Sequence, residues 1–251
     1  MKKNIVAVGS VAFDSVQTPK GKRERILGGS LTHFMNAVSL FSELSCGIIG
    51  VVGDDFEESH WNFFKEKNID IQDLKKKPGK TFFWEGYYEK DMNQAHTLKT
   101  ELNVFGDFNP EISSANTQTD FLFLGNIDPA LQLQVLDRVK FQYCLMDTMN
   151  FWLETRLEEV KKAIQKISGL IINEGEAALL TGEHSYLAAG EKLISQGLPF
   201  LIIKRGSSGV SFFSKQGDFY SFPAYPVKNL VDPTGAGDSF AGGFASYLAQ
   251  V

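Results

Sequence analysis

The sequence has few of the residues that mark metal-binding, secreted or membrane proteins. Its 251 residues include only two cysteines, Cys46 and Cys144, and four scattered histidines. Two isolated cysteines exclude a disulfide framework and favour reduced core residues in a cytoplasmic protein. Neither cysteine has a histidine at ligand spacing, which argues against a structural zinc site. No apolar run approaches the ~20 residues of a membrane span, and the apolar run at the N-terminus is too short for a signal peptide.

The chain also lacks an excess of positive charge. Lys and Arg number 25 against 30 Asp and Glu, which gives a net charge of −5. We therefore expect no general attraction to nucleic acid or to anionic membranes, and any phosphate site must be built locally. The hydrophobic content of 43% is ordinary for a globular protein. We expect residues 1–251 to form a single domain.

Short apolar runs alternate with amphipathic stretches along most of the chain, which predicts a mostly parallel sheet covered by helices on both faces. Ligands of such sheets bind beyond the carboxyl ends of the strands. The expected core strands are Asn4–Gly9, Cys46–Gly53, Phe121–Leu124, Tyr143–Met146, Gly169–Ile172 and Phe200–Ile203, and the main expected helices are Leu31–Leu44, Phe56–Lys67, Pro129–Val139, Trp152–Ile167 and Tyr186–Gln196.

Two segments interrupt this alternation. Residues 10–27 are polar with a turn at Thr18–Gly21, and residues 80–104 are aromatic and rich in β-forming residues. We predict antiparallel strands outside the α/β core, either as a lid over an active site or as plain surface strands. The second segment contains Phe82, Phe83, Trp84, Tyr87 and Tyr88.

The most informative stretch is Val231–Phe244, V-D-P-T-G-A-G-D-S-F-A-G-G-F. Its small residues leave backbone N–H groups uncovered just where an apolar helix begins, which is typical of an anion site. Asp238 would repel a phosphate bound there, so we expect it to take a proton from a hydroxyl that attacks the phosphate. A plain turn before a buried helix is the alternative.

This stretch resembles the C-terminal signature of the ribokinase-like (PfkB) carbohydrate kinases. The resemblance implies an α/β fold, namely a ribokinase-like three-layer αβα sandwich with a mostly parallel central sheet and a small β lid. It also implies ATP as phosphate donor, Asp238 as general base, and an anion hole formed by Gly235, Ala236 and Gly237.

The resemblance also implies an acceptor site. An Asp after the first strand contacts the acceptor in this family, and Asp14 holds that place. Gly28 and Gly29 resemble the start of the motif Gly-Gly-x-x-x-Asn-x-Ala, whose Asn position is occupied here by His33. We expect His33 in the pocket, where a neutral imidazole can read a hydroxyl. Asp147 follows a strand and resembles a family Asp that lines the cleft.

Two further motifs imply nucleotide and metal sites. Asn173 and Glu176 match the family's Asn-x-x-Glu, which suits Mg²⁺ bound largely through water, although the same residues could simply cap a helix. Lys204 precedes a Gly loop that resembles the family's nucleotide loop, with a hairpin turn as the alternative. The expected nucleotide-binding residues are Asn173, Lys204, Gly206, Ser207 and Gly209.

Several alternatives stay open. The acceptor is a sugar or a nucleoside, and the aromatic lid could stack on a base or form lid core. A non-catalytic ligand-binding member of the family is the rival from another class, although the presence of Asp238 favours catalysis. A dinucleotide enzyme is disfavoured because Gly9-Ser10-Val11-Ala12 does not begin G-x-G-x-x-G.

The resemblance implies further helical segments after the end of this chain, so we expect the C-terminus to be truncated relative to the family. Asp232 is a candidate ligand for a monovalent cation, and a homodimer through the lid is the expected assembly.

Overall fold

The computed structural model describes residues 2–250. The chain divides into two compact units, one formed by Met1–Phe121 with Lys228–Val251 and the other by Leu122–Val227. Strand β8 (Gln118–Leu124) runs across this division. Each unit is described below by itself.

The first unit contains parallel strands of the larger sheet. Strand β1 (Lys3–Val8) pairs in parallel with β4 (Leu44–Val52), and β4 pairs in parallel with β5 (Ile69–Lys76). Ile5 to Val8 are completely buried, which explains why this strand reads as an uninterrupted apolar run. The other elements of this part are α1 (Ser30–Val38), α2 (Glu58–Glu66), the short helices η1 (Asn103–Phe105) and η2 (Ser114–Asn116), and α8 (Ala236–Gln250).

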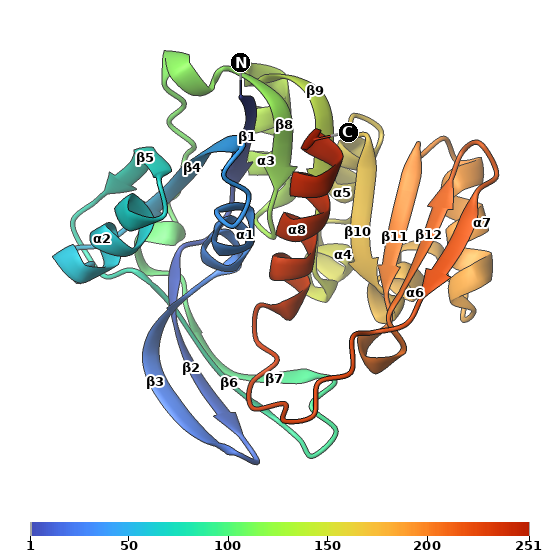
Figure 1. Cartoon of the computed structure of the whole chain (residues 1–251), viewed down its shortest axis with the longest axis horizontal. Helices are drawn as coiled ribbons and strands as arrows, with labels where there is room; N and C mark the ends of the chain where they lie inside the picture. The colour runs from blue at the N-terminus through green and yellow to red at the C-terminus, as the bar shows by residue number, and fades with distance from the viewer. Residues whose placement is uncertain (1, 251) are drawn as a thin grey trace. The chain divides into compact units, whose positions relative to one another are not determined.

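Helices α1 and α8 of the first unit pack side by side (Figure 1). The buried face of α8 consists of small residues, among them Ala241, Gly242 and Ala245. A Cβ atom on Gly242 would overlap the carbonyl oxygen of Phe34 in α1. The small residues that follow Asp238 in the sequence therefore bring the backbones of the two helices into close contact.

A second, four-stranded sheet belongs to the same unit. Its order is β3-β2-β6-β7, with β2 (Ala12–Thr18), β3 (Gly21–Gly28), β6 (Phe82–Tyr88) and β7 (Ala95–Glu101). The hairpins β2–β3 and β6–β7 are antiparallel, as expected, but β2 and β6 pair in parallel. A parallel pair needs a long crossover connection, and here α1, β4, α2 and β5 provide it.

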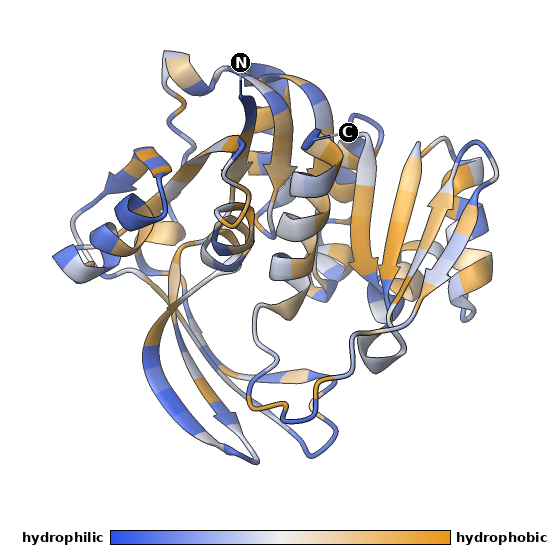
Figure 2. Cartoon of the chain, viewed as in Figure 1, coloured by the Kyte–Doolittle hydropathy of each residue, from blue (hydrophilic) through white to orange (hydrophobic). Residues whose placement is uncertain are grey.

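The second unit contains the parallel strands β9 (Lys140–Met146), β10 (Gly169–Asn173) and β11 (Phe200–Lys204). An antiparallel hairpin of β12 (Val210–Ser214) and β13 (Phe219–Phe222) follows. Figure 2 shows β10 and β11 as largely hydrophobic. The helices of this unit are α3 (Pro129–Arg138), α4 (Asn150–Thr155), α5 (Leu157–Ile164), α6 (Glu174–Thr181), α7 (Tyr186–Ser195) and the short η3 (Gly206–Ser208).

These features confirm the predicted α/β fold, with a large, mainly parallel sheet and a small second sheet. Two expectations about elements were wrong. The single helix expected at Trp152–Ile167 is two helices, because the backbone leaves the helical region at Arg156 (φ −140°, ψ 35°). The run Lys75–Lys80, with its four lysines, a proline and a glycine, predicts a solvated turn, but Lys75 and Lys76 belong to strand β5. Among residues 2–250, no helix combines the length and the apolar character that crossing a membrane would need.

Candidate active site

The glycine-rich loop of the first unit leads directly into α8. Gly235 adopts a left-handed conformation (φ 74°), which glycine tolerates without strain. The Thr234 N–H donates to Asp232 Oδ1 (2.9 Å), and the Ala236 N–H donates to the Pro233 carbonyl (3.1 Å). Asp238 lies in the first turn of α8. The sequence therefore places a carboxylate at the positive end of a helix dipole, beside a tight backbone turn.

His33 of α1 packs against this loop. A Cβ atom on Gly235 would overlap the His33 imidazole, so the ring fixes how closely the loop can approach α1. Burial lowers the pKa of His33, and the nearby charge of Asp232 offsets only part of this effect. The ring is therefore neutral at pH 7. Its Nε2 atom is buried and has no hydrogen-bond partner among the described residues.

Asp14 of β2 and the Gly28–Gly29 pair form one local arrangement. A Cβ atom on Gly28 would overlap the Asp14 carboxyl group, and the Gly29 N–H donates to Asp14 Oδ2 (3.3 Å). Gly29 has φ 88°, and a Cβ there would lie 2.5 Å from the Ser10 carbonyl oxygen. Glycine is thus required at both positions, because the Asp14 carboxyl group contacts Gly28 and the Ser10 backbone contacts Gly29.

Burial raises the pKa of Asp14 to about 6. The Gly29 N–H hydrogen bond lowers the pKa and the charge of Asp232 raises it, and both effects are smaller than that of burial. Hydrogen bonds from hydroxyl groups stabilise the charged form of a carboxylate that is shielded from solvent and close to another acid. The environment of Asp14 is therefore suited to binding the hydroxyl groups of a ligand.

Tyr88, the last residue of β6, joins the small sheet to the loop. Its hydroxyl lies 3.3 Å from Thr234 Oγ1. Burial raises the pKa of Tyr88, the Thr234 hydrogen bond lowers it, and the charges of Asp232, Asp14 and Asp238 raise it. The phenol is thus near all three carboxylates. The sequence offered no signal that separated Tyr88 from the other aromatic residues of residues 80–104.

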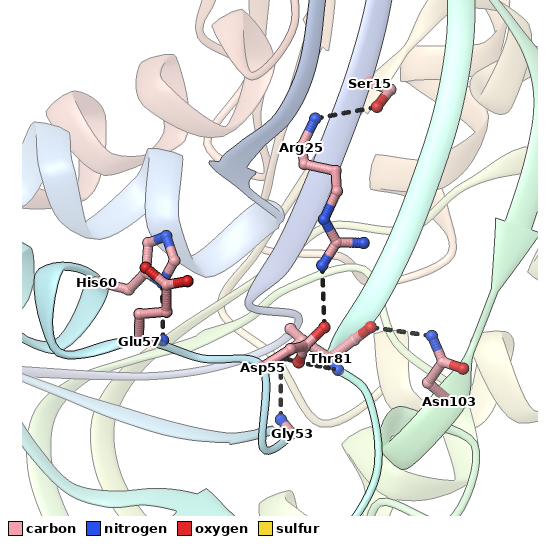
Figure 3. Close-up of polar contacts among 8 residues, drawn as sticks. All are labelled: Ser15, Arg25, Gly53, Asp55, Glu57, His60, Thr81 and Asn103. Carbon is pink, nitrogen blue, oxygen red and sulfur yellow. Dashed lines mark hydrogen bonds and ion pairs between the residues drawn. The ribbon is translucent and has the colours of Figure 1, made fainter.

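A polar cluster at the base of the small sheet anchors these strands (Figure 3). Asp55 Oδ1 accepts from the Thr81 N–H and hydroxyl (both 2.7 Å), and Asp55 Oδ2 accepts from Arg25 Nη2 (3.0 Å). Thr81 Oγ1 also accepts the Gly53 N–H (2.9 Å). Burial raises the pKa of Asp55, but these hydrogen bonds and the Arg25 charge more than offset it and hold the pKa below its ordinary value.

In the second unit, Asp147, Glu176 and Lys204 form a charged cluster. Lys204 Nζ lies 3.4 Å from Asp147 Oδ2, so the structure places Asp147 with the predicted nucleotide lysine. The pKa of Glu176 is raised to about 7, first by burial and then by the charge of Asp147, while the charge of Lys204 and the hydrogen bonds with Asn173 lower it. The single positive charge of Lys204 lies near two buried carboxyl groups. A bound cation would therefore reduce the excess negative charge of this cluster.

Asn173 and Glu176 also form a reciprocal capping box at the start of α6. Glu176 N donates to Asn173 Oδ1 (2.8 Å), and Asn173 N donates to Glu176 Oε2 (2.7 Å). The motif therefore caps helix α6, which is the alternative that the sequence left open for Asn173 and Glu176. Residues 2–250 contain no group of three or more His, Cys, Asp or Glu side chains that could hold a metal. Any Mg²⁺ at this position depends mainly on water and ligand oxygens.

The loop after β11 is a tight backbone turn. The Arg205 N–H donates to the Gly209 carbonyl (2.7 Å), and the Gly209 N–H donates to the Gly206 carbonyl (3.0 Å). Gly206 and Gly209 have φ values of 53° and 93°, and a Cβ on Gly209 would overlap the Phe222 carbonyl oxygen. Gly209 is thus required by the packing of β13, while Ser207 is exposed.

Comparisons with known proteins identify the family of the chain. The model of the pfkB family of carbohydrate kinases matches residues 2–250. The chain belongs to this family. A pfkB-family chain is a kinase, a transferase that uses ATP, typically with Mg²⁺. These statements confirm the resemblance drawn from Val231–Phe244.

Individual pfkB relatives span most of the chain. A cytidine kinase from Thermococcus kodakarensis is 28% identical over 249 residues, which cover 96% of this chain and 87% of that enzyme. The structure of an adenosine kinase from Sinorhizobium meliloti has a TM-score of 0.85 at 14% identity and covers 100% of this chain and 89% of its own. A ribokinase from Thermotoga maritima has a TM-score of 0.78 at 23% identity, with coverages of 98% and 86%. The two structures support the fold alone.

Within this pfkB kinase, the predicted residues fall into two sets. The first unit contains the loop Gly235–Asp238 with Asp14, Gly28, Gly29 and His33, and the structure adds Tyr88 and Asp232 to this group. The second unit contains Asp147, Asn173, Glu176, Lys204, Gly206, Ser207 and Gly209.

Proposed function

We propose that this pfkB kinase transfers the γ-phosphoryl group of ATP to a hydroxyl of a sugar or nucleoside, with Asp238 as general base. The observation that carries the proposal is the loop at the start of α8. It combines a left-handed Gly235, the N-terminus of a 15-residue helix and an acidic first-turn residue. An acid at this position weakens anion binding, so its useful role is proton removal.

Asp14 and His33 recognise the acceptor. The Asp14 carboxylate accepts hydrogen bonds from hydroxyl groups, and the buried His33 Nε2 offers a further polar atom beside Gly235. Binding through these groups orients the reacting hydroxyl toward Asp238. Orientation of this kind removes much of the entropic cost of a reaction between two molecules.

In the chemical step, Asp238 accepts the proton of the acceptor hydroxyl. The oxygen of that hydroxyl forms a bond to the γ-phosphorus, the bond from this phosphorus to the β,γ-bridging oxygen breaks, and ADP leaves. The N–H groups of Gly235, Ala236 and Gly237, with the dipole of α8, stabilise charge on the transferring group. The Ala236 N–H would share its bond to Pro233 or release it.

Lys204 and the Gly206–Gly209 turn bind the phosphates of ATP. Lys204 is held near Asp147 and presents a point charge suited to phosphate. Asn173 and Glu176 would hold Mg²⁺ through water, and the uncompensated charge of the Glu176 site fits a cation. Mg²⁺ supplies charge neutralisation of the phosphates. A monovalent cation near Asp232 and a homodimer through the small sheet stay predictions.

The test is Asp238→Asn, with MgATP as donor and a panel of sugars and nucleosides as acceptors. General-base catalysis contributes about 10²- to 10⁴-fold, so we expect kcat to fall by that factor while ATP affinity in calorimetry changes less than about twofold. Asp137→Asn, an exposed helical aspartate in a surface ion pair, is the matched control and should act like the unaltered protein. Near-normal turnover by Asp238→Asn would remove Asp238 from the mechanism.

A further inference from the structure

Gln132 is a buried polar residue of helix α3. The residue is 1% exposed, and its Nε2 atom donates to the carbonyl oxygens of Gly125 (2.9 Å) and Asp147 (3.1 Å). Gly125 follows the end of β8, and Asp147 follows the end of β9. One side-chain amide therefore joins the backbone just beyond two strands that are neighbours in the larger sheet.

The two carbonyl groups fix the direction in which this amide points. Only the NH₂ end of a glutamine can donate to both, so Oε1 of Gln132 points away from them, and it is buried without a hydrogen-bond partner among residues 2–250. An unpaired buried acceptor is unfavourable, and the other buried residues of α3 include the apolar Val135 and Leu136. A methionine of similar size would bury no unpaired oxygen. Core packing alone therefore does not favour glutamine at this position.

Asp147 is restrained at each of its polar groups. Its N–H donates to the Leu124 carbonyl (2.9 Å), its own carbonyl accepts from Gln132 (3.1 Å), and its Oδ1 accepts the Thr148 N–H (2.8 Å). The other carboxylate oxygen, Oδ2, lies 3.4 Å from Lys204 Nζ. Three hydrogen bonds thus fix Asp147 in the orientation in which its Oδ2 faces the lysine.

A plain structural link between β8 and β9 is the alternative role for Gln132. The Asp147 N–H already provides such a link through Leu124. Gln132 adds a hydrogen bond to the carbonyl of Asp147, which lies one residue beyond the end of β9 at Met146. The added bond therefore restrains the residue whose carboxylate faces Lys204. A lysine side chain is flexible, and a fixed carboxylate beside it restricts Lys204 to fewer arrangements before any anion binds.

We infer that Gln132 is a positioning residue for ATP binding, which holds Asp147 and through it directs Lys204 toward the phosphates. The inference rests on the proposed function, in which Lys204 binds the phosphates of ATP. Gln132 acts on ATP only through these two residues. Holding the lysine in place raises affinity because less side-chain freedom is lost when ATP binds.

The experiment is a double-mutant cycle on the Kd for ATP, measured by calorimetry. Gln132→Met keeps the size of the side chain and removes both donors. We expect it to raise the Kd about 2- to 10-fold, the factor that corresponds to fixing one flexible side chain. In the background Lys204→Met/Asp147→Asn, which has neither the ammonium nor the carboxylate group, the same change should leave the Kd unaltered, because residues that act through one another are not additive.

Two further variants complete the design. Gln134→Met changes an exposed glutamine of the same helix and should bind ATP like the unaltered protein. Gln132→Asn keeps the amide but is one methylene shorter and cannot reach both carbonyls, so it should also raise the Kd. It takes the place of Gln132→Met in the cycle if the methionine variant does not fold.

Amide hydrogen exchange separates this inference from the proposed function, because it needs no ATP. In Gln132→Met the amides of Asp147 and Thr148 should exchange faster, while those of β10 and β11 stay the same. If the unaltered protein does not bind ATP, the proposed function is overturned; faster exchange at Asp147 then still supports its positioning by Gln132, and unchanged exchange overturns it. If Lys204→Met/Asp147→Asn weakens ATP binding but Gln132→Met does not, or if the effect of Gln132→Met persists in that background, the inference is overturned and the proposed function stands.

Discussion

The Asp14 carboxyl group couples the candidate acceptor site to pH. Its pKa is about 6 in the folded protein because of burial, against an ordinary value of 3.8. Between these values the folded state keeps a proton that the unfolded state releases, so the contribution of Asp14 to stability is fully present below pH 3.8 and is lost as pH rises through 6. The difference amounts to about 3 kcal/mol at most.

We therefore expect the free energy of unfolding of Asp14→Asn to fall less between pH 4 and pH 7 than that of the unaltered protein, by about 2 kcal/mol. Urea unfolding at several pH values measures this difference. Asp137→Asn is the control, because its carboxylate is exposed and should leave the pH dependence unchanged. A parallel pH dependence for Asp14→Asn and the unaltered protein would show that the carboxyl group is not desolvated in solution.

Gly235 and His33 give a second prediction, based on steric fit. Gly235→Ala introduces a Cβ into the His33 ring at a positive φ of 74°, so we expect kcat to fall at least about tenfold and stability to drop by about 1–3 kcal/mol. The double change Gly235→Ala/His33→Ala removes the overlap. It should recover part of the stability but not the acceptor affinity, because the His33 Nε2 is lost as well. Steady-state kinetics and urea unfolding of the three variants measure this, and equal stability of the single and double variants would contradict the packing account.

Individual site residues could be predicted from the sequence where an unusual combination of residues occurs within a short stretch. The loop Gly235–Asp238 could be predicted because a glycine turn, a helix start and an acid occur together within a few residues. His33 was expected in the acceptor pocket, and the structure places its ring against Gly235. Tyr88 could not be singled out, because its contact with Thr234 joins residues 146 positions apart and no local pattern encodes that distance.

Among the elements, the small sheet depends on the Asp55 cluster at its base. Asp55 joins the loop after β4 to Arg25 in β3 and to Thr81 at the start of β6. Arg25 itself has φ 49°, and its guanidinium lies over the Phe13 ring at 4.9 Å. Asp55 therefore ties the chain just before β6 to β3 and to the loop after β4.

We expect Asp55→Ala to destabilise the small sheet. The change leaves the partly buried Thr81 N–H without its acceptor, which costs about 1–3 kcal/mol. Amide hydrogen exchange in β2 and β6 should become faster while exchange in β10 and β11 stays the same, and the KM for the acceptor should rise with little change in ATP affinity. Lys22→Gln, also in β3, removes the solvent-accessible ion pairs with Glu24 and Glu85 and should have no such effect. Uniform acceleration of exchange across the whole chain would argue against a local anchor.

The sequence indicated the strands of the larger sheet well, because strands buried on both faces appear as apolar runs bounded by glycine or polar residues. Strand pairing was harder. The parallel pair β2–β6 joins residues about 70 positions apart, such as Ala12 and Phe82, and two hairpins give no indication of how they will meet. Strand β5 was missed because Asp73 and the lysines at its end conceal it, yet Asp73 is buried and accepts hydrogen bonds from Ser113 and Asn116.

For the whole molecule, the division of the chain follows the division of predicted roles except at Asp147, which was expected in the acceptor site and lies beside Lys204 in the central unit. The other residues predicted for the acceptor, and the general base, come from the unit that contains both chain ends, and residues for the nucleotide come from the central unit. This division follows from chain topology, because α8 returns to pack against α1. Within each unit the candidate residues contact their own neighbours, as Asp14 contacts Gly28 and Gly29, and Lys204 contacts Asp147.

This arrangement predicts that the two ligands can be weakened separately. Lys204→Met removes a charged phosphate ligand, and we expect ATP affinity to fall roughly 10- to 100-fold with acceptor affinity unchanged. The Lys204→Met change leaves the buried Asp147 without its cation. The double variant Lys204→Met/Asp147→Asn has no such unpaired charge. It should lose as much ATP affinity as Lys204→Met and should unfold at a higher temperature than Lys204→Met. Asp14→Asn should show the reverse pattern and weaken only the acceptor. Calorimetric titrations of each ligand alone measure both affinities. Loss of acceptor binding in Lys204→Met/Asp147→Asn would show that the two sets of residues do not act independently in binding.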